Sequence, residues 1–200
     1  MKILFVTPYI TSDKHSMFLR NITGFGYMVY DIAKYVGKKN EVKVFVVNAI
    51  APAIEMDTFQ TIGKSWFGLI KAFSIKSLKD AIVFVKKYNV PIYEKIRIFY
   101  QYLAVAQIEK MMQDFDLIHI HGCSPITDAV IRACQRKQKS FLVTLHGLVS
   151  FEKSVRLHDS LKQYEKDFLI EAYENDYNVS FISTGNKETA LDYVKSQIQA

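Results

Sequence analysis

The feature that most constrains the fold is the alternation of short apolar runs with segments long enough for helices. Five runs rich in β-branched and aromatic residues are each five or six residues long, which is typical of buried strands. The segments between most of them are of helical length. We expect strands at 2–7, 42–47, 116–121, 141–146 and 179–183, and helices at about 24–38, 66–88, 91–113, 124–138, 151–175 and 186–198.

This alternation predicts an α/β fold, a Rossmann-like, doubly wound parallel sheet with helices on both faces. Residues 50–115 interrupt the alternation, since they offer two helical patterns and no convincing strand. We therefore expect one domain over 1–200, with a helical insertion at about 50–115 that lies over one face or edge of the sheet.

Composition excludes several classes of protein. Half of the residues are apolar and 23% are charged, as in a globular chain with a substantial core rather than a disordered one. Two cysteines make no disulfide framework, so we expect a reduced, cytoplasmic protein. The first apolar run is too short for a signal sequence, and no run reaches the roughly 18–20 residues of a membrane span.

The positive charge is concentrated in one part of the chain. The whole sequence has 26 basic and 20 acidic side chains, and residues 61–100 hold eight basic residues against Asp80 and Glu94. The net charge of +6 thus comes from one fifth of the chain. The remainder is neutral, so the charge says little about a crevice built by the sheet.

This basic segment is also aromatic. Over 66–88 apolar side chains gather on one arc of a helical wheel and most lysines lie opposite, as in helices that lie on an anionic membrane surface. An ordinary helix with a solvated basic face remains an alternative, and no motif accompanies the charge that would indicate nucleic-acid binding. The predicted membrane-contact residues are Lys64, Trp66, Phe67, Lys71, Lys76 and Lys79.

Histidines follow two neighbouring strands of the expected sheet. Ligands of open parallel sheets bind beyond the carboxyl ends of the strands, and two strands end there in His-Gly, at His121 and His146. We expect neighbouring strands to bring these imidazoles into one crevice. His119 shares a strand face with His121, being two residues away. Each histidine also has a purely structural interpretation, as a strand-end group bonded to the backbone.

Two glycines open the first expected helix. Helix N-termini with free N–H groups suit phosphate, so Gly24 and Gly26 are candidate ligand-binding residues, although glycines in loops also serve to turn the chain. A nicotinamide or flavin site is disfavoured, because Val29 replaces the third glycine and Asn48, rather than an acidic residue, follows the second strand. The loop 8–23 is long and polar, which makes His15 and Arg20 candidate acceptor contacts.

The order of these motifs resembles the N-terminal domain of GT-B glycosyltransferases of family 4, also called group 1. The resemblance covers nearly all of the chain. It depends on MKILFVTPYI, TGFGYMVYDIAKYVGKKNEVKVFVV, DFDLIHIHG, FLVTLHG and the strand NVSFIST. Met28 stands where the family often has a histidine, and Thr23-Gly24 where it has two glycines. Family members are about twice as long, so the resemblance implies an acceptor-side half whose C-terminal donor-binding domain is absent from this chain.

The resemblance also implies a mechanism. The whole enzyme would transfer a sugar from a nucleotide-sugar to an acceptor hydroxyl, with retention and without a metal or bound cofactor. Gly24 and Gly26 would face the diphosphate, His121 would meet the transferring sugar as the catalytic residue, and His146 would support it. The acceptor would be a glycan or a lipid-linked molecule in cell-surface glycan or glycolipid synthesis, with the protein peripheral on the inner face of the plasma membrane.

Other classes of function remain open. The first is a non-catalytic membrane- or carbohydrate-binding module with the same fold. The second is a metallohydrolase using His119, His121 and His146, which lacks a recognised ligand spacing and a nearby carboxylate trio. A thiol nucleophile at Cys123 is disfavoured, since small buried cysteines are usually structural.

Overall fold

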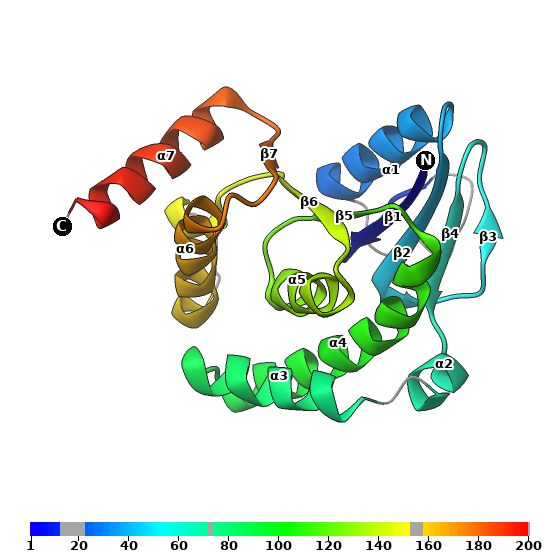
Figure 1. Ribbon diagram of the computed structural model, residues 1–200, viewed down its shortest axis with the longest axis horizontal. Helices are drawn as coiled ribbons and strands as arrows, with labels where there is room; N and C mark the ends of the chain where they lie inside the picture. The colour runs from blue at the N-terminus through cyan, green and yellow to red at the C-terminus, as the bar shows by residue number, and fades with distance from the viewer. Residues whose placement is uncertain (13–22, 72–73, 153–157, 200) are drawn as a thin grey trace.

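The computed structural model describes residues 1–12, 23–71, 74–152 and 158–199. A seven-stranded sheet with the order β3-β4-β2-β1-β5-β6-β7 runs through it (Figure 1). All neighbours pair in parallel except β3 and β4. The strands are β1 (Lys2–Thr7), β2 (Glu41–Ile50), β3 (Ile54–Glu55), β4 (Gln60–Lys64), β5 (Leu117–His121), β6 (Ser140–Leu145) and β7 (Val179–Phe181).

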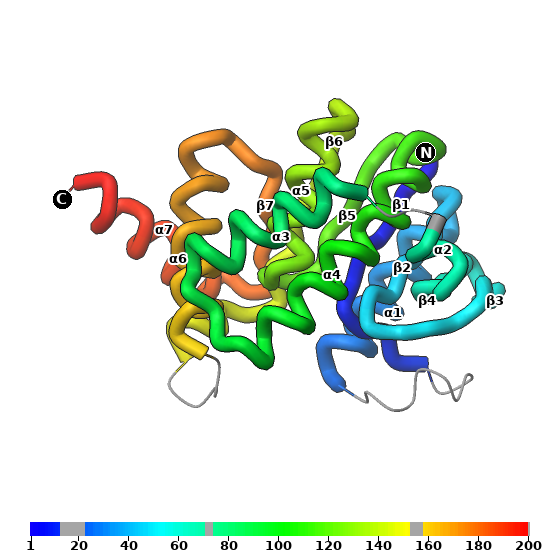
Figure 2. Tube along the Cα trace, turned by 90° about the horizontal axis from the view of Figure 1, so that it is seen from below, coloured from blue at the N-terminus to red at the C-terminus, as the bar shows by residue number. Residues whose placement is uncertain are grey.

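Helices cover both faces of this sheet, which confirms the predicted fold class. In Figure 1 α1 and α7 lie above the sheet, and α3, α4 and α5 form a layer below it. Figure 2 shows α3 and α4 packed side by side in this lower layer. The helices are α1 (Gly24–Gly37), α2 (Trp66–Lys71), α3 (Ile75–Lys87), α4 (Ile92–Met111), α5 (Pro125–Lys137), α6 (Asp159–Glu174) and α7 (Thr184–Ile198), with 3-10 turns η2 (Met112–Asp114) and η3 (Val149–Phe151).

The side chains of β1 alternate between two apolar clusters. Leu4 and Val6 belong to the larger cluster with α3, α4, α5 and α6, whereas Ile3 and Phe5 belong to the smaller one with α1. Because successive side chains of a strand point to opposite faces, a strand covered on both sides is apolar throughout. This burial explains why β1 is a continuous apolar run in the sequence.

Among the described residues, no helix is both long and apolar enough to cross a bilayer.

The expectation that 50–115 contains no strand is wrong. β4 pairs in parallel with β2, and β3 pairs with the outer edge of β4. The strand is short and has polar ends, and a Cβ at Gly63 would lie 2.7 Å from the backbone of Ala49 and Ala51, so only glycine fits there. Such a strand lacks the apolar pattern that reveals the others.

The expected single helix over 66–88 is also wrong. α2 ends at Lys71, and α3 begins at Ile75 after its N-cap Ser74, whose hydroxyl accepts a hydrogen bond from the Ser77 N–H. The expected helix over 151–175 is α6, which begins only at Asp159, with His158 as its N-cap. In both places a side chain that caps the helix competes with continuation of the helical pattern.

With β4 included, the six parallel strands have the order expected of a doubly wound fold. In chain order they are arranged 3-2-1-4-5-6, so that β1 and β5 are neighbours and the direction of winding reverses between them. The carboxyl ends of β1 and β5 therefore flank the position at which such sheets bind ligands.

Candidate functional site

The candidate site lies at the carboxyl end of β5, beside the start of α1. His121 is the last residue of β5, and Gly122 follows with φ of +87°, a backbone conformation that favours glycine. The Gly122 N–H donates to the Thr144 carbonyl of β6 at 2.8 Å, and Phe25 of α1 lies over Gly122. This turn brings the end of β5 against β6 and the first turn of α1.

His121 and His146 form a hydrogen-bonded pair at the carboxyl ends of β5 and β6, the region that is called the crevice below. The distance from His121 Nδ1 to His146 Nε2 is 2.9 Å. The Phe5 ring lies 5.0 Å from the His121 ring, and the Phe25 ring 4.4 Å from the His146 ring, between centroids. His121 is 2% exposed, and His146 is more accessible. The prediction that the two His-Gly strand ends converge is confirmed.

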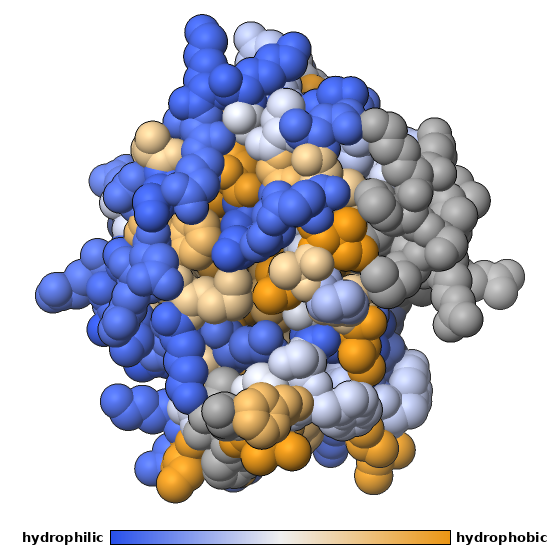
Figure 3. Space-filling model, turned by 90° about the vertical axis from the view of Figure 1, so that its right-hand side faces the viewer, coloured by the Kyte–Doolittle hydropathy of each residue, from blue (hydrophilic) through white to orange (hydrophobic). Residues whose placement is uncertain are grey.

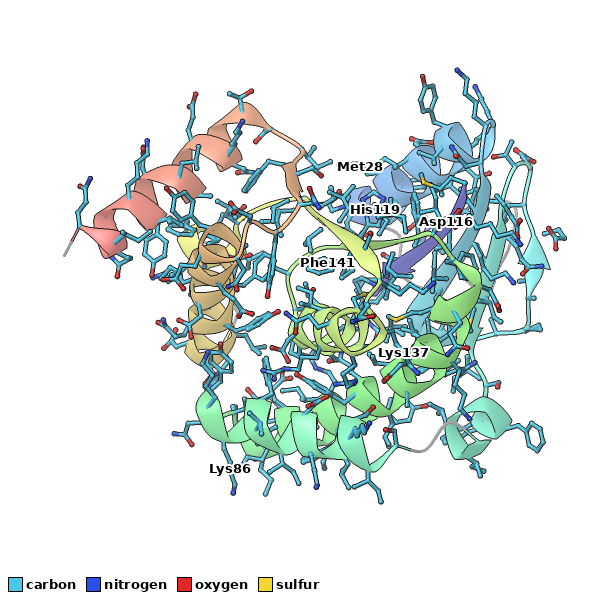
Figure 4. All side chains as sticks on the ribbon, viewed as in Figure 1. Met28, Lys86, Asp116, His119, Lys137 and Phe141 are labelled. Carbon is cyan, nitrogen blue, oxygen red and sulfur yellow. The ribbon has the colours of Figure 1, made fainter. Side chains whose placement is uncertain are left out.

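His119 lies beside this pair but bonds elsewhere. Its Nε2 atom is 2.7 Å from Thr144 Oγ1, and Thr144 Oγ1 is 2.7 Å from Ser180 Oγ. These three side chains form a polar row across β5, β6 and β7, and the His119 and His121 rings are 4.2 Å apart. His119 thus has the structural role that the sequence left open. Figure 4 labels it on the side of the sheet where α1 lies.

Burial keeps these imidazoles neutral. It lowers the pKa of both His119 and His146 from 6.5 to about 4, and the nearby His146 lowers the pKa of His119 further. The pKa of His121 falls well below its usual value, through burial first and then through the other two histidines. At neutral pH the group therefore offers hydrogen bonds without a positive charge, which suits hydroxyl groups better than phosphate.

The two glycines at the start of α1 have different surroundings. Gly24 is exposed at the first helical position. The Gly26 N–H donates to the side chain of the N-cap Thr23 at 3.0 Å, so it is not available to a diphosphate, and that expected role is wrong. A Cβ at Gly26 would overlap Thr11 Oγ1, so this glycine instead permits close packing of the loop after β1.

Some expected contact residues lie outside the described part of the chain. This applies to His15 and Arg20 and to the side chain of Lys71. Lys64 is described, and it is only 4% exposed, with its Nζ 4.0 Å from the centroid of the Tyr100 ring. Burial lowers its pKa from 10.5 to about 8. A buried lysine cannot lie on a membrane surface, so its expected role there is corrected.

The other predicted membrane-contact residues are exposed. Trp66 and Phe67 of α2 are 63% and 67% exposed, and Lys76 and Lys79 of α3 also face outward. Figure 3 shows hydrophobic side chains gathered at the lower end of the face on which α2 lies. The start of α4 was not predicted as part of this surface, yet Ile92, Tyr93 and Ile96 are also exposed there. Three large apolar side chains beside Lys95 and Arg97 were the signal in the sequence that could have indicated this part of the surface.

A further residue that the sequence did not reveal holds the loop that follows His146. Glu165 of α6 is buried and accepts hydrogen bonds from the N–H groups of Val149 and Ser150 in η3. Burial raises its pKa, and these hydrogen bonds oppose that rise. The carboxylate thereby anchors the loop that follows His146. Sequence patterns carry no sign of it, because the partners are backbone groups.

The described residues do not support two alternative chemistries. No group of three or more histidine, cysteine or acidic residues among them is arranged to hold a metal ion. Burial raises the pKa of the Cys123 thiol well above its usual value, so Cys123 is protonated and a poor nucleophile at neutral pH.

Two solved structures resemble this fold. One is the α,α-trehalose-phosphate synthase (UDP-forming) from Burkholderia vietnamiensis, with a TM-score of 0.52 and 13% identity over 98% of this chain and 44% of that chain. The other is the α,α-trehalose 6-phosphate synthase from Burkholderia multivorans, with a TM-score of 0.49 and 15% identity over 98% and 42%. No family profile and no curated protein matches the sequence. The first likeness supports the Rossmann-like fold of a GT-B domain, and this chain spans less than half the length of either protein.

Proposed function

We propose that this chain is the N-terminal, acceptor-side half of a retaining glycosyltransferase that moves a sugar from a nucleotide-sugar to an acceptor hydroxyl. The observation that carries this proposal is the neutral His121–His146 pair at the switch point of the sheet. A crevice that offers uncharged hydrogen-bonding groups beside aromatic rings suits the hydroxyl-rich face of a sugar. The likeness to a UDP-forming synthase supports the same class of reaction.

In this proposal each part of the crevice has a task. His121 meets a hydroxyl of the transferring sugar or positions the acceptor, and His146 holds the His121 ring. The exposed amide of Gly24, at the positive end of α1, faces the leaving diphosphate. The second domain, which the proposal places downstream of residue 200, holds the rest of the nucleotide-sugar. This half alone does not turn over substrate. We place the full-length enzyme in glycosyltransferase family 4.

The first experiment establishes the length of the natural gene product and screens nucleotide-sugars for hydrolysis or transfer by the full-length protein. We expect His121→Ala to lose most of the rate while circular dichroism shows the fold intact. His158→Ala is the matched control, because His158 is an exposed histidine at the start of α6. Unchanged activity in His121→Ala would contradict the catalytic role. A natural stop after Ala200 would favour the non-catalytic binding module or an enzyme assembled from two chains.

We further propose that the protein binds an anionic membrane surface through α2, α3 and the start of α4. These elements form what we term the basic apolar face. Its lysines, such as Lys86 in Figure 4, point away from the body of the protein. Bulky apolar side chains on a basic background are typical of interfacial membrane binding. The exposed apolar members are Trp66, Phe67, Ile70, Ile75, Ile82, Val83, Ile92, Tyr93 and Ile96.

Co-sedimentation with vesicles tests this surface. We expect binding to vesicles that contain phosphatidylglycerol and little binding to phosphatidylcholine alone. Replacing Lys76 and Lys79 by glutamine removes two charges, each worth about 1 kcal/mol or roughly fivefold in affinity at an anionic surface. The matched control is Lys39→Gln, since Lys39 is exposed beyond the end of α1. Equal binding to both kinds of vesicle would contradict the membrane proposal and would mean that these lysines are only solvated surface.

A further inference from the structure

Two ring nitrogen atoms of the histidine pair, here called its outer nitrogens, take no part in the hydrogen bond between the rings. His121 Nδ1 and His146 Nε2 bond to each other, which leaves His121 Nε2 and His146 Nδ1. Both of these atoms are buried, and neither has a hydrogen-bond partner among the described residues. An unpaired buried polar group costs about 1–3 kcal/mol, so two of them in one crevice point to a ligand rather than to a packing accident.

The shared hydrogen bond links the protonation of the two rings. A neutral imidazole carries one proton, on Nδ1 or on Nε2. If His121 Nδ1 donates, His146 Nε2 must be bare, and both rings are Nδ1–H tautomers. If His146 Nε2 donates instead, both rings are Nε2–H tautomers. In either case one outer nitrogen is a donor and the other is an acceptor.

We propose that His121 and His146 form a coupled dyad in which both rings always carry the same tautomer, so that the crevice presents one donor and one acceptor to a hydroxyl-bearing ligand. His146 is then a positioning residue, because its bond decides which role His121 Nε2 plays. A hydroxyl group both donates and accepts, so a ligand with neighbouring hydroxyls satisfies both outer nitrogens. The ligand class rests on the proposed function, whereas the coupling of the tautomers does not.

The surroundings of the dyad favour its neutral form. The aromatic rings of Phe5 and Phe25 flank it, and His119 adjoins it on β5 with its own bond to Thr144. Among the described residues, neither histidine has a carboxylate as a hydrogen-bond partner. Burial lowers the pKa of both rings, and the other two imidazoles lower the pKa of His121 further. The two rings themselves, being neutral, therefore offer an inorganic anion no positive charge.

Nitrogen-15 NMR of histidine-labelled protein reads the tautomers directly. At neutral pH we expect the wild-type 200-residue chain to show His121 and His146 both as Nδ1–H or both as Nε2–H forms. Different tautomers on the two rings, or a cationic ring, would overturn the coupling. No substitution is needed for this test, so it does not depend on the folding of a variant.

Variants and probes then test positioning and ligand class. His146→Phe removes the bond, so the His121 ring should become a mixture of tautomers, while the exposed-site control His158→Gln should leave it unchanged. A single unchanged His121 tautomer in folded His146→Phe would contradict the positioning role. Glucose at high concentration should shift the outer nitrogens of both rings, and inorganic phosphate should not.

The NMR titrations and the sugar-transfer assay together distinguish failure of the dyad from failure of the proposed function. A shift with phosphate, or none with glucose, would overturn the hydroxyl ligand. Coupled tautomers in a protein that transfers no sugar would leave the dyad standing and remove the proposed function. Sugar transfer by a full-length protein whose two rings carry different tautomers would remove the dyad and leave the proposed function standing.

Discussion

Replacing His119 by glutamine should remove part of the acid sensitivity of this fold. His119 is 9% exposed and bonded through Nε2 to Thr144 Oγ1, and its pKa is about 4 in the folded protein against 6.5 for an ordinary histidine. Glutamine cannot take up a proton, and its side-chain amide can still donate to the Thr144 hydroxyl. The substitution therefore removes the titration with little change to the polar row.

The sign and size of the effect follow from linkage. Because the folded pKa is the lower one, the unfolded chain binds the proton first as the pH falls. The contribution of His119 to stability is thus complete above pH 6.5, declines below it and stops changing below about pH 4. With these two pKa values, the free energy of unfolding falls by about 2 kcal/mol between pH 7 and pH 5.

Urea denaturation at these two pH values, followed by circular dichroism, measures this difference. We expect the wild-type protein to lose about 2 kcal/mol more than His119→Gln, while both keep the loss due to the buried His121 and His146. His158→Gln is the matched control for a histidine-to-glutamine substitution, since His158 is exposed and lies outside the polar row of His119, Thr144 and Ser180. The linkage reasoning fails if His119→Gln and the wild type lose equal stability.

Three further substitutions test the turn, the loop and the helix start that surround the crevice. Gly122→Ala should destabilise the fold by about 1–2 kcal/mol in urea, because φ of +87° disfavours any side chain there. Glu165→Gln should cost about 1–3 kcal/mol and speed amide exchange at Val149 and Ser150, since it weakens charge-assisted bonds to their N–H groups. Thr23→Ala should cost about 1 kcal/mol and speed exchange in the first turn of α1, where Thr23 caps the helix.

The parts of the fold that could be predicted are those whose pattern is local. β1, β5 and β6 are apolar runs because helices or neighbouring strands bury them, and burial leaves its mark on each residue. The parts that could not be predicted depend on partners far along the chain. β4 is held by β2 despite its polar ends, and Lys64 is buried because Tyr100 of α4 lies against its amine.

The same distinction applies to the site. Two strands that end in His-Gly could be placed at one edge of a parallel sheet, and the prediction that they meet is confirmed. Which ring nitrogens face each other could not be foreseen, since this depends on the turn at Gly122 and on the packing of Phe25. The anchoring of the following loop by Glu165 was equally hidden.

Charge is distributed unevenly between the two sides of the sheet. The histidines of the crevice are neutral and lie on the side of the sheet that carries α1, whereas the exposed lysines of α3 lie beyond its other face (Figure 4). The basic excess therefore cannot balance a diphosphate held beside His121. Among the described residues near the crevice, the start of α1 is left as the source of positive potential, since it presents amides and a helix dipole. Under the proposed function, this half would recognise hydroxyls and supply little charge for phosphate, because the donor's phosphates would be bound mainly by the other half.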